Sequence, residues 1–245
     1  MSSSFIHYDL LHNIALKNYA VGTTTLTQAA QIWLIKISDH ITLLNEAAVI
    51  LDEGEQIKAG KLRKEEDKNR FIIGRIMLRK LLADILHCQP NDVQIILSAH
   101  NKPILDGASA GSLHFSLSHS GEYILIGISN NEIGVDIEHI DRKFEYKNIL
   151  QQCFTSEEST CINNGGSANF YLLWTRKEAL LKATGKGLIS KLAEINAMNG
   201  RQGTLHEIID SSKDYLVSSV RFNDSYVASI CRETGNDEII LWSWQ

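Results

Sequence analysis

The chain has 245 residues, of which 44% are hydrophobic and 22% charged, and its formal net charge is −5. This composition is typical of one large or two small globular domains, excludes a disordered chain, and gives no reason to expect nucleic-acid binding. Because neither a leader-like start nor an apolar run long enough to cross a bilayer is present, we expect a cytoplasmic protein without membrane attachment.

The first half of the sequence predicts helices followed by strands. Residues 1–28 are polar and weakly patterned, and we interpret them as an N-terminal extension before a strand at 31–37. A helical region then continues to residue 86 and includes a long amphipathic helix around 70–79. After Pro90, alternating apolar residues between Ser-Gly and Asn-Asn turn signals predict strands at 93–97, 113–117, 123–128 and 133–137.

The second half repeats this order. A helix is predicted at 169–183, and strands are predicted at 215–222, 226–231 and 239–242. We therefore expect an α+β fold of two similar lobes related by a pseudo-two-fold, an N-terminal lobe over 29–130 and a C-terminal lobe over 131–245. Each lobe is expected to pack a long helix on a small antiparallel sheet of three strands.

Positive charge is concentrated between residues 58 and 80. This segment holds nine basic residues against three acidic ones, on a chain that is acidic as a whole. Such a cluster suits a polyphosphate or an acidic partner, and the alternative is a solvated helix face. Charge alone does not separate the two interpretations.

Three carboxylates suggest a divalent-metal site. Asp136 and Glu138 stand two apart on a predicted strand, so both side chains project from one face. Glu178 and Lys182 stand four apart on the predicted helix and also share a face. Mg²⁺ prefers oxygen ligands, and the four scattered cysteines lack the spacing of a zinc site. Each residue alone suits an exposed strand face or a surface ion pair, but the three acids together favour a metal site.

Two further blocks carry possible phosphate donors. Residues 115–121, Phe-Ser-Leu-Ser-His-Ser-Gly, bring the Ser118 hydroxyl and the His119 imidazole to the end of a strand, where the alternative is a turn-capping histidine. Lys102 precedes that strand in an Asn-Lys-Pro loop, and its alternative is a solvated lysine. A glycine-rich nucleotide loop is absent from the sequence, which disfavours ordinary nucleotide folds. Ser118 and His119 are adjacent on a predicted strand and therefore point to opposite faces, which argues against a serine hydrolase.

Taken in order, these blocks resemble the 4′-phosphopantetheinyl transferase superfamily, and in particular its two-lobed, surfactin-synthetase-activating (Sfp) type. The resemblance covers roughly residues 30–245 and is most specific at Gly-Val-Asp-Ile-Glu (134–138) and Trp-Thr-Arg-Lys-Glu-Ala-Leu-Leu-Lys (174–182). Ser116 stands where family members commonly carry Asn, and residues 1–28 have no recognisable counterpart.

The resemblance implies a reaction in which coenzyme A (CoA) donates 4′-phosphopantetheine to a serine of an apo carrier protein and adenosine 3′,5′-bisphosphate is released. It assigns Mg²⁺, which Mn²⁺ could replace, to Asp136, Glu138 and Glu178. Catalysis is assigned to Glu178 and to Lys182, which stabilises the leaving group. Glu178 would accept the serine proton directly or through a water, and the alternative acceptor is a metal-bound water. The remaining CoA contacts that it implies, besides Lys182, are Arg70, Lys102, Ser118, His119 and Lys177. The N-terminal lobe would thus bind CoA, and the C-terminal lobe would supply the metal and catalytic groups.

The implied partners are apo acyl or peptidyl carrier domains of fatty-acid, polyketide or nonribosomal-peptide systems. These carriers are acidic helical bundles, so part of the 58–80 cluster could attract them. Two lobes in one chain imply a monomer. One rival is a catalytically silent paralogue that binds carriers or CoA, which predicts a lost ligand or lysine. The other is a Mg²⁺-dependent phosphotransferase or hydrolase of free nucleotides.

Overall fold

The computed structural model describes residues 17–19, 24, 27–107, 111–187, 192–198, 201–202, 213–222, 224–235 and 238–244. Most of the expected N-terminal extension lies outside the described residues. The strands are β1 (Lys17–Tyr19), β2 (Ala30–Lys36), β3 (Ile95–Leu97), β4 (Pro103–Leu105), β5 (His114–Ser120), β6 (Tyr123–Ser129), β7 (Ile133–His139), β8 (Arg201–Gln202), β9 (Tyr215–Phe222), β10 (Tyr226–Glu233) and β11 (Ile239–Trp244). Strand β1 lies within the segment predicted as an extension.

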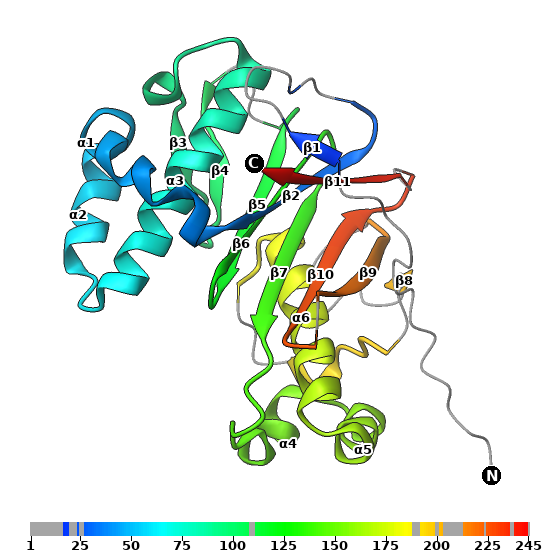
Figure 1. Ribbon diagram of the computed structural model, residues 1–245. Coiled ribbons are helices and arrows are strands. Elements are labelled where there is room, and N and C mark those ends of the chain that lie inside the picture. Colours follow the sequence, from blue (N-terminus) through cyan, green and yellow to red (C-terminus); the bar gives the residue numbers. More distant parts are fainter. Residues whose placement is uncertain are drawn as a thin grey trace.

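Two long helices and several short ones accompany the strands (Figure 1). The α-helices are α1 (Ala47–Ile50), α2 (Glu53–Lys61), α3 (Glu65–Leu86), α4 (Leu150–Cys153), α5 (Ser156–Gly165) and α6 (Ser167–Thr184). The 3-10 segments are η1 (Ile37–Glu46), η2 (Pro90–Asp92), η4 (Tyr146–Ile149) and η5 (Leu192–Glu194). This mixture confirms the α+β class. Among the described helices, none is long and apolar enough to cross a membrane.

Two sheets form the centre of the molecule. The first has the strand order β1-β11-β2-β6-β5, the second has the order β7-β10-β9-β8, and β3 and β4 form a separate antiparallel pair. Strands β2, β6 and β5 are antiparallel neighbours, as are β7, β10 and β9. Each predicted half therefore contributes three antiparallel strands. The two-fold relation between the halves stays a prediction.

Strand β11 departs from the predicted arrangement. The sequence suggested that it continues the meander of β9 and β10, but it pairs in parallel with β2 and β1 in the first sheet. Leu241 packs in the cluster between the sheets, while Trp244 packs in the cluster under α3. A strand that is apolar on both faces fits either sheet, and its sequence does not specify which edge it joins.

Each long helix covers one sheet. Helix α3 begins with three acidic residues, which suit the helix dipole, and it buries Ile73, Met77 and Leu81 against the first sheet. Helix α6 ends at Thr184 and is capped by Gly185, whose left-handed conformation (φ 70°) favours glycine, and it packs on the second sheet. A third apolar cluster lies between the sheets and includes side chains of β2, β6, β7 and β10. The core thus separates four layers in the order α3, first sheet, second sheet, α6.

Candidate active site

Strand β7 and helix α6 approach so closely that only glycine fits between them. A Cβ added at Gly134 would lie 2.0 Å from the Ala179 carbonyl oxygen and 2.4 Å from the Ala183 nitrogen. Alternation along β7 puts Asp136 and Glu138 on the same face as Gly134, whereas Val135 packs between the sheets. The first two acids of the predicted metal site therefore lie on the strand face that α6 covers.

Asp136, Lys182 and Ser118 are in direct contact. The Lys182 ammonium donates to Asp136 Oδ1 at 2.7 Å and to Ser118 Oγ at 2.8 Å. The Ser118 hydroxyl donates to Asp136 Oδ1 at 2.7 Å. Asp136 is 3% exposed, and its Oδ2 is buried without a hydrogen-bond partner among the described residues. One oxygen of this carboxylate is thus satisfied and the other is not, which is costly for a buried charge.

The negative charge of Asp136 acts on both Glu138 and Glu178. Burial, followed by the neighbouring charge of Asp136, raises the pKa of Glu138 to about 7, although its side chain accepts a hydrogen bond from Ser120 at 2.8 Å. Burial and then Asp136 also raise the pKa of Glu178, while Lys182 opposes that shift. Two carboxyl groups whose pKa values are raised in this way, beside the buried Asp136, form a site that favours a bound cation.

The acids fit an oxygen-preferring divalent cation in ligand type and charge, and the unpartnered Asp136 Oδ2 is an available ligand atom. Their side chains do not converge in this arrangement. Among the described residues, no three His, Cys, Asp or Glu side chains are grouped closely enough to hold a metal ion. Lys182 instead neutralises part of the negative charge.

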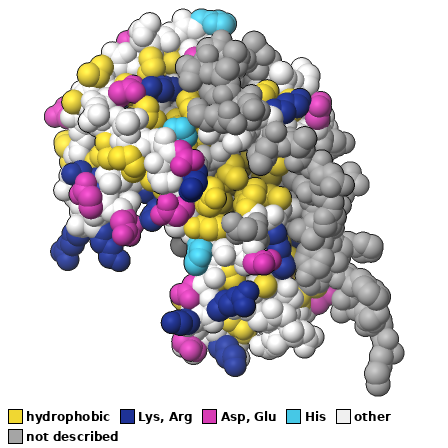
Figure 2. Space-filling model, viewed as in Figure 1, with side chains coloured by type: hydrophobic (Ala, Val, Ile, Leu, Met, Phe, Trp, Pro, Cys, Tyr) yellow, Lys and Arg dark blue, Asp and Glu magenta, His cyan; other side chains and the backbone are white. Residues whose placement is uncertain are grey.

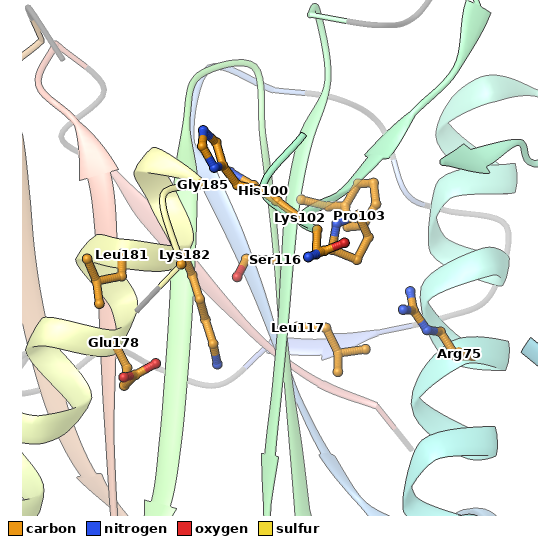
Figure 3. A pocket seen from close by; sticks show the side chains of 13 residues that line it. Arg75, His100, Lys102, Pro103, Ser116, Leu117, Glu178, Leu181, Lys182 and Gly185 are labelled. Atoms are coloured by element: carbon orange, nitrogen blue, oxygen red, sulfur yellow. The ribbon is translucent and has the colours of Figure 1, made fainter. Parts of the chain in front are cut away.

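A cavity of about 250 Å³ opens beside these groups, between α3, β5 and α6 (Figure 3). Glu178 and Lys182 reach it from α6, and Arg75 reaches it from α3. Its apolar wall consists of Pro103, Phe115, Leu117 and Leu181, and its other polar lining is His100, Asn101, Lys102 and Ser116. A ligand that has both anionic and apolar parts would match this lining.

Lys102 is held at the rim of the cavity by the end of α6. Its ammonium donates to the Ala183 carbonyl oxygen at 2.8 Å, where a cation complements the helix dipole. Asn101, with a φ of 62°, turns the chain between β3 and β4, and Pro103 begins β4 directly after Lys102. The loop therefore aims this lysine at the C-terminal lobe.

Arg70 and His119 lie near the far end of β5. The Arg70 side chain donates to the Gly121 carbonyl oxygen at 3.1 Å and pairs with Asp67 at 2.9 Å. His119 is exposed, yet partial desolvation and then the positive charges of Arg70 and Lys182 lower its pKa. Ser118 is buried and lies on the opposite face of β5 from His119. Its hydroxyl therefore contacts Asp136.

Lys177 is not part of this arrangement. Its side chain is fully buried, its ammonium lies 2.8 Å from a Glu158 carboxylate oxygen, and it donates to the carbonyls of Leu192 and Ile195. The structure thus contradicts the expectation that Lys177 lies near a pyrophosphate. Consecutive helical residues point about 100° apart, so Glu178 can face the cavity while Lys177 faces the core.

Much of the positive charge of 58–80 is already paired. Arg79 is buried against Asp52 and Glu55, Arg75 lies 3.6 Å from Glu55, and Lys68, Arg70 and Lys80 also have acidic partners. Among the described residues, four cations of this segment form no salt bridge with an acidic side chain, and these are Lys58, Lys61, Arg63 and Lys64. Figure 2 shows Lys and Arg side chains projecting from the lower edge of this helical region.

Several residues of this region were not singled out from the sequence as site residues. Arg75, His100, Asn101 and Ser116 line the cavity, and Ser120 contacts Glu138. The serines carried a usable signal. Ser116, Ser118 and Ser120 alternate on one strand and, after His114, give that face three hydroxyl groups in succession, which is unusual for a strand between two apolar layers.

Comparisons with known proteins show the family of this chain. The model of the 4′-phosphopantetheinyl transferase superfamily matches residues 132–231, and a model of the N-terminal part of 4′-phosphopantetheinyl transferases matches residues 40–131. The protein slr0495 of Synechocystis sp. is 35% identical over 170 residues, which are 67% of this chain and 68% of that protein. The chain belongs to the 4′-phosphopantetheinyl transferase superfamily.

The proteins similar to this chain include Sfp, which defines the type suggested by the sequence. The 4′-phosphopantetheinyl transferase HetI of Nostoc sp. is 31% identical over 178 residues, 70% of this chain and 75% of HetI. The 4′-phosphopantetheinyl transferase Sfp of Bacillus subtilis is 24% identical over 186 residues, 71% of this chain and 78% of Sfp. The family resemblance and the expectation of an enzyme of this class are thus confirmed.

Proposed function

We propose that this protein transfers 4′-phosphopantetheine from CoA to a serine of an apo acyl or peptidyl carrier protein, with Mg²⁺, and releases adenosine 3′,5′-bisphosphate. The observation that carries the proposal is the contact of Asp136 with Lys182 beside a cavity lined by Glu178 and Lys102. Lysine ammonium groups that can stabilise phosphate charge thus lie beside carboxylates that can hold a cation, and phosphoryl transfer depends on such charge stabilisation.

The residues divide the chemistry between them. Mg²⁺ would be held by Asp136, Glu138 and Glu178, and when bound it offsets the negative charge of the pyrophosphate. Glu178 accepts the proton of the carrier serine, directly or through a water. The serine oxygen then forms a bond to the β-phosphorus as the bond to the bridging oxygen breaks. Lys182 stabilises the charge that develops on the departing bisphosphate.

The nucleotide part of CoA is assigned to the cations of the N-terminal half. Arg70 and His119 lie near each other at the end of β5, and Lys102 lines the cavity. Ser118 would contribute by fixing Lys182 and Asp136, since its hydroxyl already contacts both. We further propose a monomeric, cytoplasmic enzyme without nucleic-acid or membrane partners, on the basis of composition and chain organisation.

Both rivals are weaker. A silent paralogue predicts a lost ligand or lysine, but Asp136, Glu138, Glu178 and Lys182 are all present. A phosphotransferase of free nucleotides would need a nucleotide loop, which the sequence lacks.

Intact-protein mass spectrometry tests the proposal. An apo peptidyl carrier domain and an apo acyl carrier protein are each incubated with the enzyme, CoA and Mg²⁺. We expect a gain of one phosphopantetheine on the carrier serine, its loss with EDTA, and a rate at least about 10²-fold lower for Glu178→Gln. CoA binding without any gain would favour the silent paralogue, and failure to bind CoA would refute the proposed substrate.

A further inference from the structure

Strands β5 and β7 lie side by side at the boundary between the two sheets. Strand β5 is an edge strand of the first sheet, and β7 is an edge strand of the second. No backbone pairing joins them among the described residues, since β5 pairs with β6 and β7 pairs with β10. Side chains must therefore satisfy the polar groups that face across this boundary.

Three alternate serines of β5 make these contacts. Ser116 Oγ accepts from the Val135 backbone N–H at 3.0 Å. Ser118 Oγ donates to Asp136 Oδ1, as described above. Ser120 Oγ accepts from the His139 backbone N–H at 3.0 Å and donates to Glu138 Oε2 at 2.8 Å. The contacts advance in the same direction along both strands, so the hydroxyls replace a missing ladder.

The three hydroxyls are not equivalent. Ser116 contacts backbone only, whereas Ser118 shares its carboxylate with the ammonium of Lys182. Among the described residues, Ser120 is the one hydrogen-bond partner of the Glu138 carboxylate. A hydroxyl has a single proton, and because Ser120 Oγ accepts from the His139 N–H, its own O–H is directed to Glu138.

This arrangement fixes a side chain that is otherwise mobile. A glutamate has several rotatable bonds, and immobilising it when a ligand binds costs conformational free energy. The Ser120 hydroxyl, itself anchored to the β7 backbone, selects one orientation of Glu138 beforehand. Groups that orient metal ligands in this way commonly change metal affinity by 10- to 100-fold when they are removed.

We propose that Ser120 is a positioning residue for divalent-cation binding, which acts by restricting the Glu138 carboxylate through a hydrogen bond anchored on the His139 N–H. The inference rests on the proposed function, because it takes Glu138 as a ligand. It adds a residue of the N-terminal half to a metal site whose three acids all belong to the C-terminal half.

Mn²⁺ binding to the full chain without CoA, measured by titration calorimetry, tests the inference apart from turnover. We expect Ser120→Ala to weaken Mn²⁺ binding about tenfold or more, and to raise the Mg²⁺ concentration for half-maximal transfer by a similar factor. Ser120→Thr keeps the hydroxyl and should restore both values to near wild type. Ser116→Ala is the matched control, since it removes a hydroxyl of the same strand face that contacts backbone only.

Thermal unfolding of each variant separates loss of folding from loss of positioning. Unchanged Mn²⁺ binding by a folded Ser120→Ala, or equal weakening by Ser116→Ala, would overturn the inference while leaving the proposed reaction intact. A wild-type protein that transfers phosphopantetheine in EDTA and binds no Mn²⁺ would overturn the metal requirement of the proposed function itself.

Discussion

Replacing Gly134 by alanine should separate the catalytic groups of this enzyme. The new Cβ would lie 2.0 Å from the Ala179 oxygen and 2.4 Å from the Ala183 nitrogen, two backbone atoms that a regular helix joins by a hydrogen bond. Real Cβ contacts essentially never fall below 3.0 Å, so strand and helix must part by roughly 1 Å. Backbone cannot rotate away as a flexible side chain can.

Two losses follow from this displacement. Overpacking of a close-packed core costs about 1–3 kcal/mol of the free energy of unfolding, and a backbone clash belongs at the upper end. Helix α6 also carries Glu178 and Lys182, and a misplacement of about 1 Å can reduce an enzymatic rate about 10²-fold. We therefore expect a folded but less stable Gly134→Ala whose kcat/KM falls by about that factor.

The assay combines urea unfolding with carrier phosphopantetheinylation followed by mass spectrometry. Gly60→Ala is the control, because a Cβ at that position in α2 meets nothing within 4 Å and should leave stability equal or slightly higher. If Gly134→Ala unfolds at the wild-type urea concentration and transfers at the wild-type rate, the close approach of β7 and α6 is not what aligns the site.

Further changes test the charges of the site. Since folding raises the pKa of Glu138 from 4.5 to about 7, its contribution to stability is complete below pH 4.5 and is lost as the pH rises to about 7. In EDTA the lost stability amounts to ~3 kcal/mol, and it is measured as the decrease of the free energy of unfolding with pH, a decrease that Glu138→Gln should lack. The same pH dependence in wild type and Glu138→Gln would contradict this prediction. Lys177→Met should lower the free energy of unfolding by about 3–5 kcal/mol, because it leaves the Glu158 carboxylate buried without a cationic partner. The KM for CoA should be unchanged in the fraction that folds. A raised KM without lost stability would instead support a contact between Lys177 and a phosphate of CoA. Replacing both Lys61 and Lys64 by glutamate should raise the KM for an acidic carrier, most strongly at low salt, and leave the affinity for CoA nearly unchanged. If carrier use and CoA affinity were lost equally, a carrier role for these lysines would be refuted.

The sequence by itself determined most of the elements and the local spacing of the site. Alternation placed Asp136 and Glu138 on one strand face, and a spacing of four placed Glu178 and Lys182 on one helix face, as the structure has them. These relations extend over a single strand or helix, where side-chain direction follows from backbone geometry alone. Amino-acid patterns that repeat every two or about 3.6 residues report such local geometry directly.

Only the tertiary structure decided which faces and edges meet. Strand β11 joins β2 rather than β10, and Lys177 turns into the core although Glu178 beside it reaches the cavity. The hydroxyl of Ser120 contacts Glu138 because the edge strands of two different sheets lie together there. Such contacts join residues far apart in the chain, and they depend on how whole layers pack rather than on any local pattern.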